Sequence, residues 1–467
     1  MKINIILSVL ISALLFSCNS QPKEAFDLLI IHANVVDVAN GEVYADQFIG
    51  ISQDTIRIVS TNAALSEYKA ADTLDAAGAY LMPGLWDNHV HFRGGDSLIA
   101  ENKTLLPLFL ANGITTVREA GGDITPTVLD WKAQIRKGEL SGPDIFTSGP
   151  KLDGDGWSWE GSIPVTNKEE VSKALDSLQK LKVDFVKIYD GSITPEMYYE
   201  IISQASKRGF KVTGHMPMDA DLNKAVALGL DGIEHLYYLM PQGSAVADSI
   251  RDLKIGFQGL PLLTETYDND LAEKNFRSLA EKNIYVTATL YISNVLFNIP
   301  TMDLDSKTYL KYMGPGIQKT YERRIKTAMN MSEKSKAYNR KRIEKFNEMI
   351  PPIYDSGIHI LAGSDCGAFN SFVYPGVSLI EELRELVKQG LTPQQALSAS
   401  MINGPGFFDL SEYYGDIAPG KVGNLIVLEK NPLEDIEAIK TLEAVIKNGK
   451  TFSKDMLEKM LSEVVYD

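Results

Sequence analysis

Residues 82–91 read Met82-Pro83-Gly84-Leu85-Trp86-Asp87-Asn88-His89-Val90-His91, an apolar run that begins at a Pro-Gly pair and ends in two histidines. Successive side chains of a strand point to opposite faces, so His89 and His91 share one face. Two imidazoles on one face suit a divalent cation. A lone His-x-His pair is equally compatible with two polar residues at a strand edge, so the surrounding sequence is needed to distinguish a metal site from this alternative.

Residues 81–410 alternate between short β-like runs and helical runs. The pattern predicts strands at residues 85–91, 115–119, 144–148, 185–189, 211–215, 232–235, 284–289 and 359–364. It predicts helices between them, for example at residues 168–181, 196–208, 221–228 and 379–388. Eight strands with helical crossovers favour an α/β fold, a (β/α)8 TIM barrel. The connections after the sixth and seventh strands are long, about 45 and about 65 residues, a length typical of lids or caps.

Both ends of the chain are rich in short β-like runs. Residues 26–73 contain several, separated by turn residues such as Asn40-Gly41. Residues 420–428 and 445–451 contain two more, the second with an Asn448-Gly449 hairpin turn. Neither end has enough strands to bury its own apolar face. We therefore predict that residues 24–80 and 411–467 combine into one small β-sandwich.

The first residues have the pattern of a signal peptide, predicted at residues 1–17. Lys2 precedes a short apolar run, which ends in Leu15-Phe16-Ser17-Cys18. This ending resembles the bacterial lipobox, which implies lipidation of Cys18. An ordinary secretory signal or a buried helix is the alternative. The resemblance predicts an exported protein, periplasmic or at the cell surface, attached to a bacterial envelope membrane only through its lipid anchor.

The composition narrows the classes of partner. Of 467 residues, 44% are hydrophobic, enough for a large core. The formal net charge of -15 argues against a nucleic-acid partner, because phosphate binding requires a basic face. We expect a small-molecule substrate, with a homo-oligomer left open. Of the two cysteines, lipidation of Cys18 would leave Cys366 alone, so no intrachain disulfide is expected.

Four further motifs close predicted strands in the same way as His89-Val90-His91. They are Phe185-Val186-Lys187-Ile188-Tyr189, Thr213-Gly214-His215, Ile233-Glu234-His235 and Ala362-Gly363-Ser364-Asp365. Together with residues 82–91, this series resembles the amidohydrolase superfamily over nearly the whole mature chain. The branch it resembles contains imidazolonepropionase-like proteins and Xaa-Pro dipeptidases. The resemblance implies a metal-dependent hydrolase with a split β-sandwich.

The resemblance also implies a set of metal ligands. It predicts two divalent metal ions, for which zinc is the first candidate. The ligands would be His89, His91, Lys187, His215, His235 and Asp365. Asp365 would also move a proton from the attacking water to the leaving group.

Lys187 is the most informative of these positions. In the binuclear branch, the matching lysine reacts with CO2 to form a carbamate that bridges the metals. The alternative is an ammonium paired with Asp190 or Asp184 outside the barrel. In imidazolonepropionase, the corresponding site holds one metal ion and lacks such a lysine. By this resemblance, Lys187 argues against that activity.

Residues for substrate binding are less clearly marked. Tyr237 and Tyr238 follow His235 and could hold a substrate carboxylate or pack in a lid. Arg118 closes the second strand and could bind a carboxylate or pair with Glu119 or another acid. The loop after the third strand lacks the histidine of dipeptidase relatives and carries Trp157 and Trp159, a possible aromatic wall. His32, His359 and Cys366 are expected to be structural.

These observations predict hydrolysis of an amide-type C–N bond in a small substrate, such as an Xaa-Pro dipeptide or an N-acyl amino acid. Two alternatives stay open. One is hydrolysis of a cyclic amide or lactone, and the other is a non-catalytic surface binding protein that retains the metal site.

Overall fold

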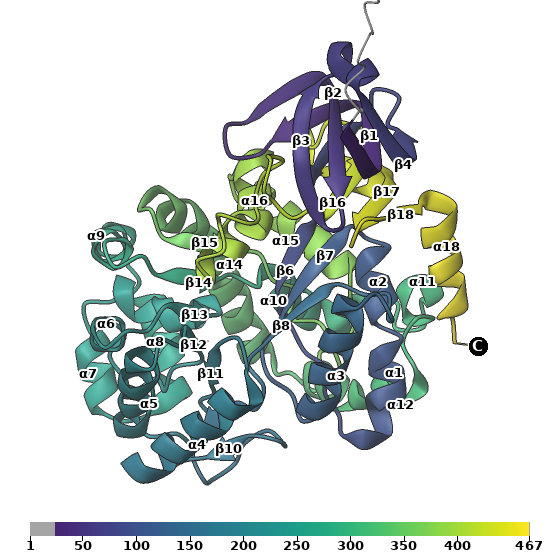
Figure 1. Ribbon diagram of the computed structural model, residues 1–467. Coiled ribbons are helices and arrows are strands. Elements are labelled where there is room, and N and C mark those ends of the chain that lie inside the picture. Colours follow the sequence, from purple (N-terminus) through teal and green to yellow (C-terminus); the bar gives the residue numbers. More distant parts are fainter. Residues whose placement is uncertain (1–23, 467) are drawn as a thin grey trace, which may run out of the picture.

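The computed structural model describes residues 24–466, so the predicted signal peptide and Cys18 lie outside the described residues. The predicted α/β fold is confirmed. Parallel strands and helices form the larger body, and a sheet built from both ends of the chain packs on one side of it (Figure 1). Every predicted strand of the larger body is present: β6 (Leu85–Val90), β7 (Ile114–Glu119), β8 (Asp144–Thr147), β11 (Val186–Ile188), β12 (Val212–Gly214), β13 (Gly232–Glu234), β14 (Tyr285–Thr287) and β15 (His359–Leu361).

The parallel strands do not form one continuous ladder. They fall into three sheets, with the orders β6-β7-β8, β10-β9-β11-β12 and β13-β14-β15. The short strands β9 (Leu152–Asp153) and β10 (Ile163–Pro164) lie in the loop after β8 and were not predicted. Backbone hydrogen bonds join neighbouring sheets: Asp184 N to Thr147 O, Asp231 N to Val212 O, and Asn88 N to Ala362 O. The last of these brings the eighth strand beside the first.

The four helices named from the sequence are also present, each within about two residues of its predicted bounds. They are α4 (Lys168–Leu181), α5 (Pro195–Lys207), α6 (Leu222–Ala227) and α15 (Val377–Lys388). In α4, the Asn167 side chain accepts a hydrogen bond from Glu170 N and so caps the first turn. Its apolar residues recur at helical spacing and are buried: Val171, Ala174, Leu175 and Leu178.

Other helices surround the strands. They are α1 (Ile99–Lys103), α2 (Leu106–Leu110), α3 (Thr125–Arg136), α16 (Pro393–Met401), α17 (Asn403–Phe407) and α18 (Lys454–Glu463). No helix among residues 24–466 is long and apolar enough to cross a membrane.

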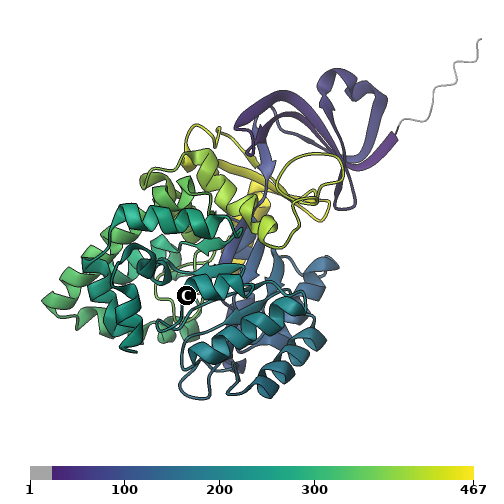
Figure 2. The same cartoon turned by 90° about the vertical axis from the view of Figure 1, so that its left-hand side faces the viewer.

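The two long connections are helical. The connection after β13 contains α7 (Ala247–Asp252), α8 (Leu260–Glu265) and α9 (Asn269–Ala280). The connection after β14 contains α10 (Leu290–Asn298), α11 (Lys307–Leu310), α12 (Pro315–Thr320), α13 (Glu322–Met329) and α14 (Glu333–Asp355). Turned by 90°, the molecule shows these teal and green helices gathered on one side, far from the purple strands (Figure 2).

Both ends of the chain contribute to a single sheet, so the prediction that they pair is confirmed. The sheet has eight strands, in the order β18-β17-β16-β5-β1-β2-β3 with β4 beside β1, and is one hydrogen-bonded sheet rather than two packed ones. The strands are β1 (Glu24–Asp37), β2 (Glu42–Ser52), β3 (Thr55–Thr61), β4 (Tyr68–Asp75), β5 (Tyr80–Pro83), β16 (Leu425–Leu428), β17 (Leu442–Lys447) and β18 (Lys450–Ser453). Because β5 extends to Pro83, the sheet continues past the predicted boundary at residue 80.

The central strands of this sheet are buried on both faces. In β16, Leu425 and Val427 join the core of the sheet, whereas Ile426 and Leu428 join the large core of the barrel. This double burial explains why residues 425–428 read as an uninterrupted apolar run instead of an alternating one.

Ile426 therefore connects the two bodies, and we predict that Ile426→Ala lowers the free energy of unfolding by about 2–5 kcal/mol. The fully buried side chain leaves a cavity at the junction of sheet and barrel. Tyr44→Ala is the control, because Tyr44 is 46% exposed on β2. Urea unfolding followed by circular dichroism measures both, and an Ile426→Ala midpoint equal to that of the control would show that the junction adds no stability.

Candidate metal centre

The structure brings the six predicted ligands together at the C-terminal ends of the barrel strands. His89 lies on β6, and His91 comes one residue after it. Lys187 lies within β11, and His215 and His235 directly follow β12 and β13. Asp365 follows β15 by four residues. His235 and Asp365 have φ values of 72° and 56°, so the chain turns sharply as it leaves each strand.

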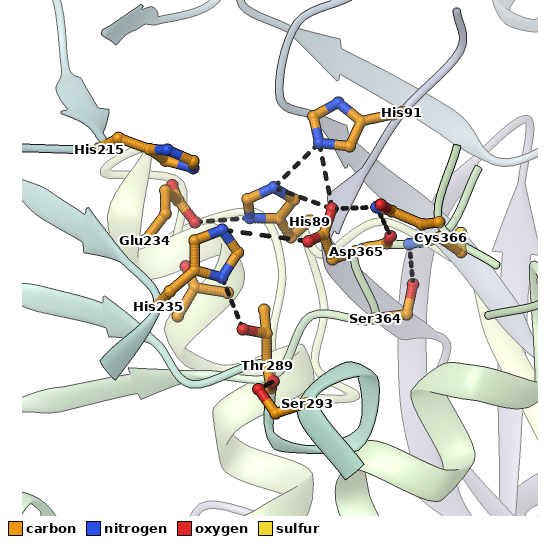
Figure 3. Close-up of polar contacts among 12 residues, drawn as sticks. His89, His91, His215, Glu234, His235, Thr289, Ser293, Ser364, Asp365 and Cys366 are labelled. Atoms are coloured by element: carbon orange, nitrogen blue, oxygen red, sulfur yellow. Dashed lines mark hydrogen bonds and ion pairs between the residues drawn. The ribbon is translucent and has the colours of Figure 1, made fainter. Parts of the chain in front are cut away.

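His89, His91 and Asp365 form the tightest group (Figure 3). Their ligand atoms lie within 4.8 Å of one another. The His89 and His91 Nε2 atoms are 3.2 Å apart, and His91 Nε2 lies 3.2 Å from Asp365 Oδ1. His89 Nε2 is 3.6 Å from the same oxygen. Three donors this close, all buried, are a suitable set for one divalent cation.

His215 and His235 extend this group on its other side. His235 Nε2 is 4.0 Å from Asp365 Oδ2, the second oxygen of that carboxylate. The rings of His215 and His235 are 4.9 Å apart, centre to centre. Asp365 therefore lies between His89 and His91 on one side and His235 on the other.

Each histidine uses its Nδ1 atom for a hydrogen bond within the protein. The partners are Glu234 Oε2 for His89 (2.7 Å), Gly121 O for His91 (2.8 Å), Asp190 Oδ1 for His215 (2.9 Å) and Thr289 Oγ1 for His235 (2.7 Å). Carbonyl and carboxylate oxygens only accept, so Nδ1 of the first three rings carries the proton. Burial lowers the pKa of all four imidazoles, which favours their neutral forms.

This arrangement tests whether the residues fit a metal. With the protons on Nδ1, the Nε2 lone pairs of His89 and His91 face each other across 3.2 Å. Two such lone pairs repel unless a cation lies between them. The donor chemistry therefore fits a bound divalent cation, and the partners on Nδ1 are of the kind that orient metal-binding imidazoles.

Arg118 does not reach the substrate side of the site. Its guanidinium is fully buried and donates to Glu234 at 2.9 and 3.0 Å and to Thr287 Oγ1 at 2.8 Å. The sequence left two roles open for Arg118, binding a substrate carboxylate or pairing with an acid. In the structure it pairs with an acid, Glu234, and so does not bind substrate. Although burial alone would raise the pKa of Glu234, the guanidinium of Arg118 holds it well below its usual range.

Lys187 is buried and its ammonium group has no hydrogen-bond partner among the described residues. The carboxylates that could have held it are engaged elsewhere. Asp184 pairs with Lys132, and Asp190 binds His215 and Tyr238. Burial lowers the pKa of Lys187 to about 8, so a sizeable fraction is the neutral amine near pH 7 to 8.

The two tyrosines after β13 occupy different places. Tyr237 lines the cavity above the ligands and stacks on the His235 ring, with centroids 5.4 Å apart. Tyr238 is fully buried and donates from its hydroxyl to Asp190 Oδ2 at 2.5 Å. Tyr237 is thus placed to touch a substrate, whereas Tyr238 supports His215 through Asp190.

Asp365 is held by a residue that the sequence did not reveal. Asn370 Nδ2 donates to Asp365 Oδ1 at 2.8 Å, and Arg324 on α13 donates to Asn370 Oδ1 at 2.8 Å. This chain of hydrogen bonds runs from the long connection after β14 to the carboxylate. Within the described residues, Asp365 Oδ2 has no hydrogen-bond donor.

Five of the six predicted ligands form the floor of a cavity of about 520 Å³, and the fully buried His89 lies outside its lining. The rest of its wall contains cations that the sequence did not single out: Arg93, Lys151, Arg323, Arg324 and Arg342. Trp157 and Trp159 also line it, in agreement with the aromatic wall expected there. Asp365 is the one acidic residue of this wall within the described chain.

Of the residues expected to be structural, His32 and His359 lie away from this floor, whereas Cys366 directly follows Asp365. His32 pairs with Asp75 on the terminal sheet, and His359 Nε2 lies 2.8 Å from Asn283 Oδ1 at the start of β15. Cys366 is buried in the barrel core and does not line the cavity.

Comparison with known proteins agrees with this geometry. The sequence profile described as the Amidohydrolase family matches residues 80–452. Ochratoxinase of Aspergillus niger is 23% identical over 91% of this chain and 86% of its own length. Its crystal structure has a TM-score of 0.67 at 20% identity, over 92% of this chain and 96% of that one.

Two further crystal structures share the fold. Bottromycin amidohydrolase has a TM-score of 0.72 at 19% identity, over 94% of this chain and 91% of that one. An Xaa-Pro dipeptidase with bound methionine has a TM-score of 0.66 at 19% identity, over 91% and 99% of the two chains. Since the family profile spans most of the sequence, including every expected ligand, the chain belongs to the amidohydrolase family of metal-dependent hydrolases that act on carbon–nitrogen bonds.

Proposed function

We propose that this protein hydrolyses the amide bond of an N-acyl amino acid or an Xaa-Pro dipeptide. The observation that carries this proposal is the group of His89, His91 and Asp365, of which His91 and Asp365 line a cavity with cationic walls. The ligand atoms supply a metal site, and the cations suit a substrate with a free carboxylate. The similarity to an ochratoxinase and an Xaa-Pro dipeptidase supports a substrate of this kind.

Two divalent ions, zinc in the first instance, would be held by His89, His91, Lys187, His215, His235 and Asp365. A divalent cation there lowers the pKa of water from about 15.7 to roughly 7–9 and polarises the scissile carbonyl. Because the four imidazoles are neutral ligands, they would leave most of the positive charge of the metal ions available to activate water and the carbonyl. The hydrogen-bond partners on Nδ1 hold the four rings in place.

Asp365 moves the proton in this proposal. Asn370 donates to Oδ1, which leaves Oδ2 free of donors among the described residues. We place the proton from the attacking water on Oδ2. The same oxygen then delivers it to the nitrogen of the departing amine as the C–N bond breaks. Asn370 acts as a positioning residue, because its two hydrogen bonds fix the direction of the carboxylate.

Lys187 supplies an anionic ligand in this proposal. The neutral amine attacks CO2, an N–C bond forms, one C=O π bond opens, and the amine proton leaves to solvent. The product is a carbamate whose two oxygens would serve as anionic metal ligands. The unpartnered, buried ammonium position supports this assignment, since a lysine cation beside two metal ions is electrostatically unfavourable.

The alternatives predict different results in one screen. Zinc-loaded protein without its signal peptide is incubated with Xaa-Pro dipeptides, N-acyl amino acids, cyclic amides and lactones, and the released amine or acid is measured. Turnover of the first two groups supports the proposal. Turnover confined to the cyclic amides or lactones favours a hydrolase of those rings. A fully metal-loaded protein that turns over nothing favours a binding protein.

The location of the protein is also a proposal. We infer export and lipid attachment at Cys18, to either face of a bacterial envelope membrane, from the lipobox-like sequence alone. The described chain starts on the terminal sheet, so an anchor would join the molecule on that body rather than on the helices of the long connections.

Asp365→Asn is predicted to lower kcat by at least about 10²-fold while most of the metal stays bound. The amide keeps one ligand oxygen but cannot accept the proton. His215→Ala should instead lower the metal content, because it removes a ligand outright. His32→Ala, on the terminal sheet, is the matched control. The measurements are kcat with a substrate from the screen and metal content on the same preparations. Near-normal kcat in Asp365→Asn would refute its role in proton transfer.

Lys187→Met is predicted to reduce the metal content from about two ions per chain toward one, since the bridging ligand cannot form. Wild-type protein supplied with 13C-bicarbonate should show a protein-bound carbamate carbon by NMR, and the variant should lack it. Lys151→Met is the control, because Lys151 is the other buried lysine of this cavity. A carbamate signal that persists in Lys187→Met, or is absent from wild type, contradicts the assignment.

Cys18→Ser is predicted to release the protein from the membrane fraction or to leave its signal peptide attached. Without the thiol, no thioether to lipid can form. The second cysteine provides the control, since Cys366→Ala should leave membrane association unchanged. Fractionation and intact mass distinguish the two, and a Cys18→Ser protein with wild-type mass and location would exclude lipidation.

A further inference from the structure

Three cations surround the ring of Trp159 on the wall of the cavity. The Arg93 Cζ atom lies 4.6 Å from the ring centroid, Lys151 Nζ lies 5.5 Å from it and Arg323 Cζ lies 5.7 Å from it. They come from separate parts of the chain: the loop after β6, the loop after β8, and α13 in the long connection after β14. We refer to these three residues as the Trp159 cation cluster.

None of the three cations pairs with a carboxylate in the part of the chain that the structure describes. Arg93 donates from Nε to Ala368 O at 2.9 Å, which leaves its terminal N–H groups without an acceptor. The Lys151 ammonium forms neither a hydrogen bond nor an ion pair within residues 24–466, although the residue is 2% exposed. Two other buried cations do pair with acids, Arg118 with Glu234 and Lys447 with Asp144, whereas Lys187 has no partner among the described residues.

Arg93 and Lys151 are buried, whereas Arg323 is exposed. Burial and the neighbouring Arg93 lower the pKa of Lys151 to about 7, so holding both positive charges here costs free energy that a bound anion would offset. The ring face of Trp159 offsets part of this cost through cation–π contacts. It offers no negative charge. Asp365, the acid of this cavity, lies within electrostatic range of Arg93, but among the described residues it contacts histidines and forms no ion pair with the cluster.

Other parts of the same wall are apolar. The long connection after β14 contributes Ile292, Leu296 and Phe297 from α10, Met331 from the turn between α13 and α14, and Phe346 from α14. The cavity therefore combines a metal-binding floor, a cationic region and an apolar region. A ligand that fits all three carries a hydrolysable bond, negative charge and an apolar group.

We propose that the Trp159 cation cluster selects a substrate with two carboxylates, namely an acidic amino acid, glutamate or aspartate, acylated on nitrogen by an apolar group. This inference rests on the proposed amide hydrolysis and narrows its substrate class. One carboxylate would leave two of the three cations uncompensated. A second carboxylate gives Arg93 and Arg323 an acceptor each, with Lys151 close to both.

A kinetic comparison tests this selection. N-acyl-L-glutamate and N-acyl-L-glutamine with the same apolar acyl group have nearly the same shape but differ by one charge. We expect the glutamate compound to have at least about tenfold higher kcat/KM, as a charge-assisted contact implies. Arg323→Gln should bring the two compounds to within a few-fold of each other. Equal kcat/KM values for the two compounds in the wild-type protein would overturn the proposal.

Lys326→Gln provides the matched control. Lys326 lies on the same helix as Arg323 and is exposed, but it does not line the cavity. Its loss removes one positive charge from α13 without touching the cluster, so the preference for glutamate should remain. A similar loss of preference in both variants would trace the effect to the general charge of the helix and contradict a specific role of Arg323.

Binding provides a measurement that does not depend on turnover. Glutarate, a dicarboxylate without an amide bond, should change the tryptophan fluorescence of the metal-loaded protein by acting beside Trp159, whereas butyrate should not. Arg323→Gln and Lys151→Met should each weaken glutarate binding by about tenfold or more. Glutarate binding that is unaffected by both variants refutes the cluster. Normal glutarate binding with no hydrolysis of any amide refutes the proposed function instead.

Discussion

The buried carboxylate of Glu234 is the interaction on which the centre of the barrel depends. It accepts hydrogen bonds from Arg118 on β7, Thr213 on β12 and His89 on β6. Arg118 in turn donates to Thr287 on β14, so five strands meet around one ion pair. An uncompensated charge at this position would cost several kcal/mol, whereas the pair with Arg118 leaves Glu234 free to orient the His89 ring. The metal site above is built on this pair, because it fixes which nitrogen of His89 faces the cation.

The strands could be predicted from the sequence because they follow local rules, whereas the expected ligand set was implied by the resemblance of these motifs to the amidohydrolase superfamily. The apolar runs have the length of strands, and each ligand motif closes one of them. The role of Arg118 could not be predicted in this way. Alternation along β7 gives the face of the side chain but not its depth in the barrel, and depth decides whether a guanidinium meets Glu234 or a substrate. Glu234 itself left a signal, since a buried acid next to a ligand histidine suits the role of orienting an imidazole.

The cationic wall could not be predicted for a different reason. Arg93, Lys151 and Arg323 lie in loops or in an inserted helix, where no periodicity specifies direction, and only the folded chain brings them to Trp159. The terminal sheet is a similar case. The alternating runs predicted its strands, but the 14-residue length of β1, which pairs with β4 along its first half and β5 near its end, makes one sheet where two were expected. The chain has a net charge of -15, so the positive charge of the cavity contrasts with the negative charge of the molecule as a whole. Such a contrast concentrates field lines at the site and favours the approach of anions to it over the rest of the molecule.

The pairing of β5 with β16 has a consequence for how the chain matures. Pro83 lies opposite Leu425, so the sheet closes only when a segment near the end of the chain reaches one near its beginning. Until then, β5 presents unpaired backbone groups along an apolar edge, the kind of surface that recruits strands from other molecules. During synthesis, all the barrel strands are made before β16. The edge of β5 therefore has to be protected until then, either by folding of the barrel or by a chaperone. Trimming of the chain before residue 425 would make the exposed edge permanent, and such a fragment would aggregate even with its ligands intact.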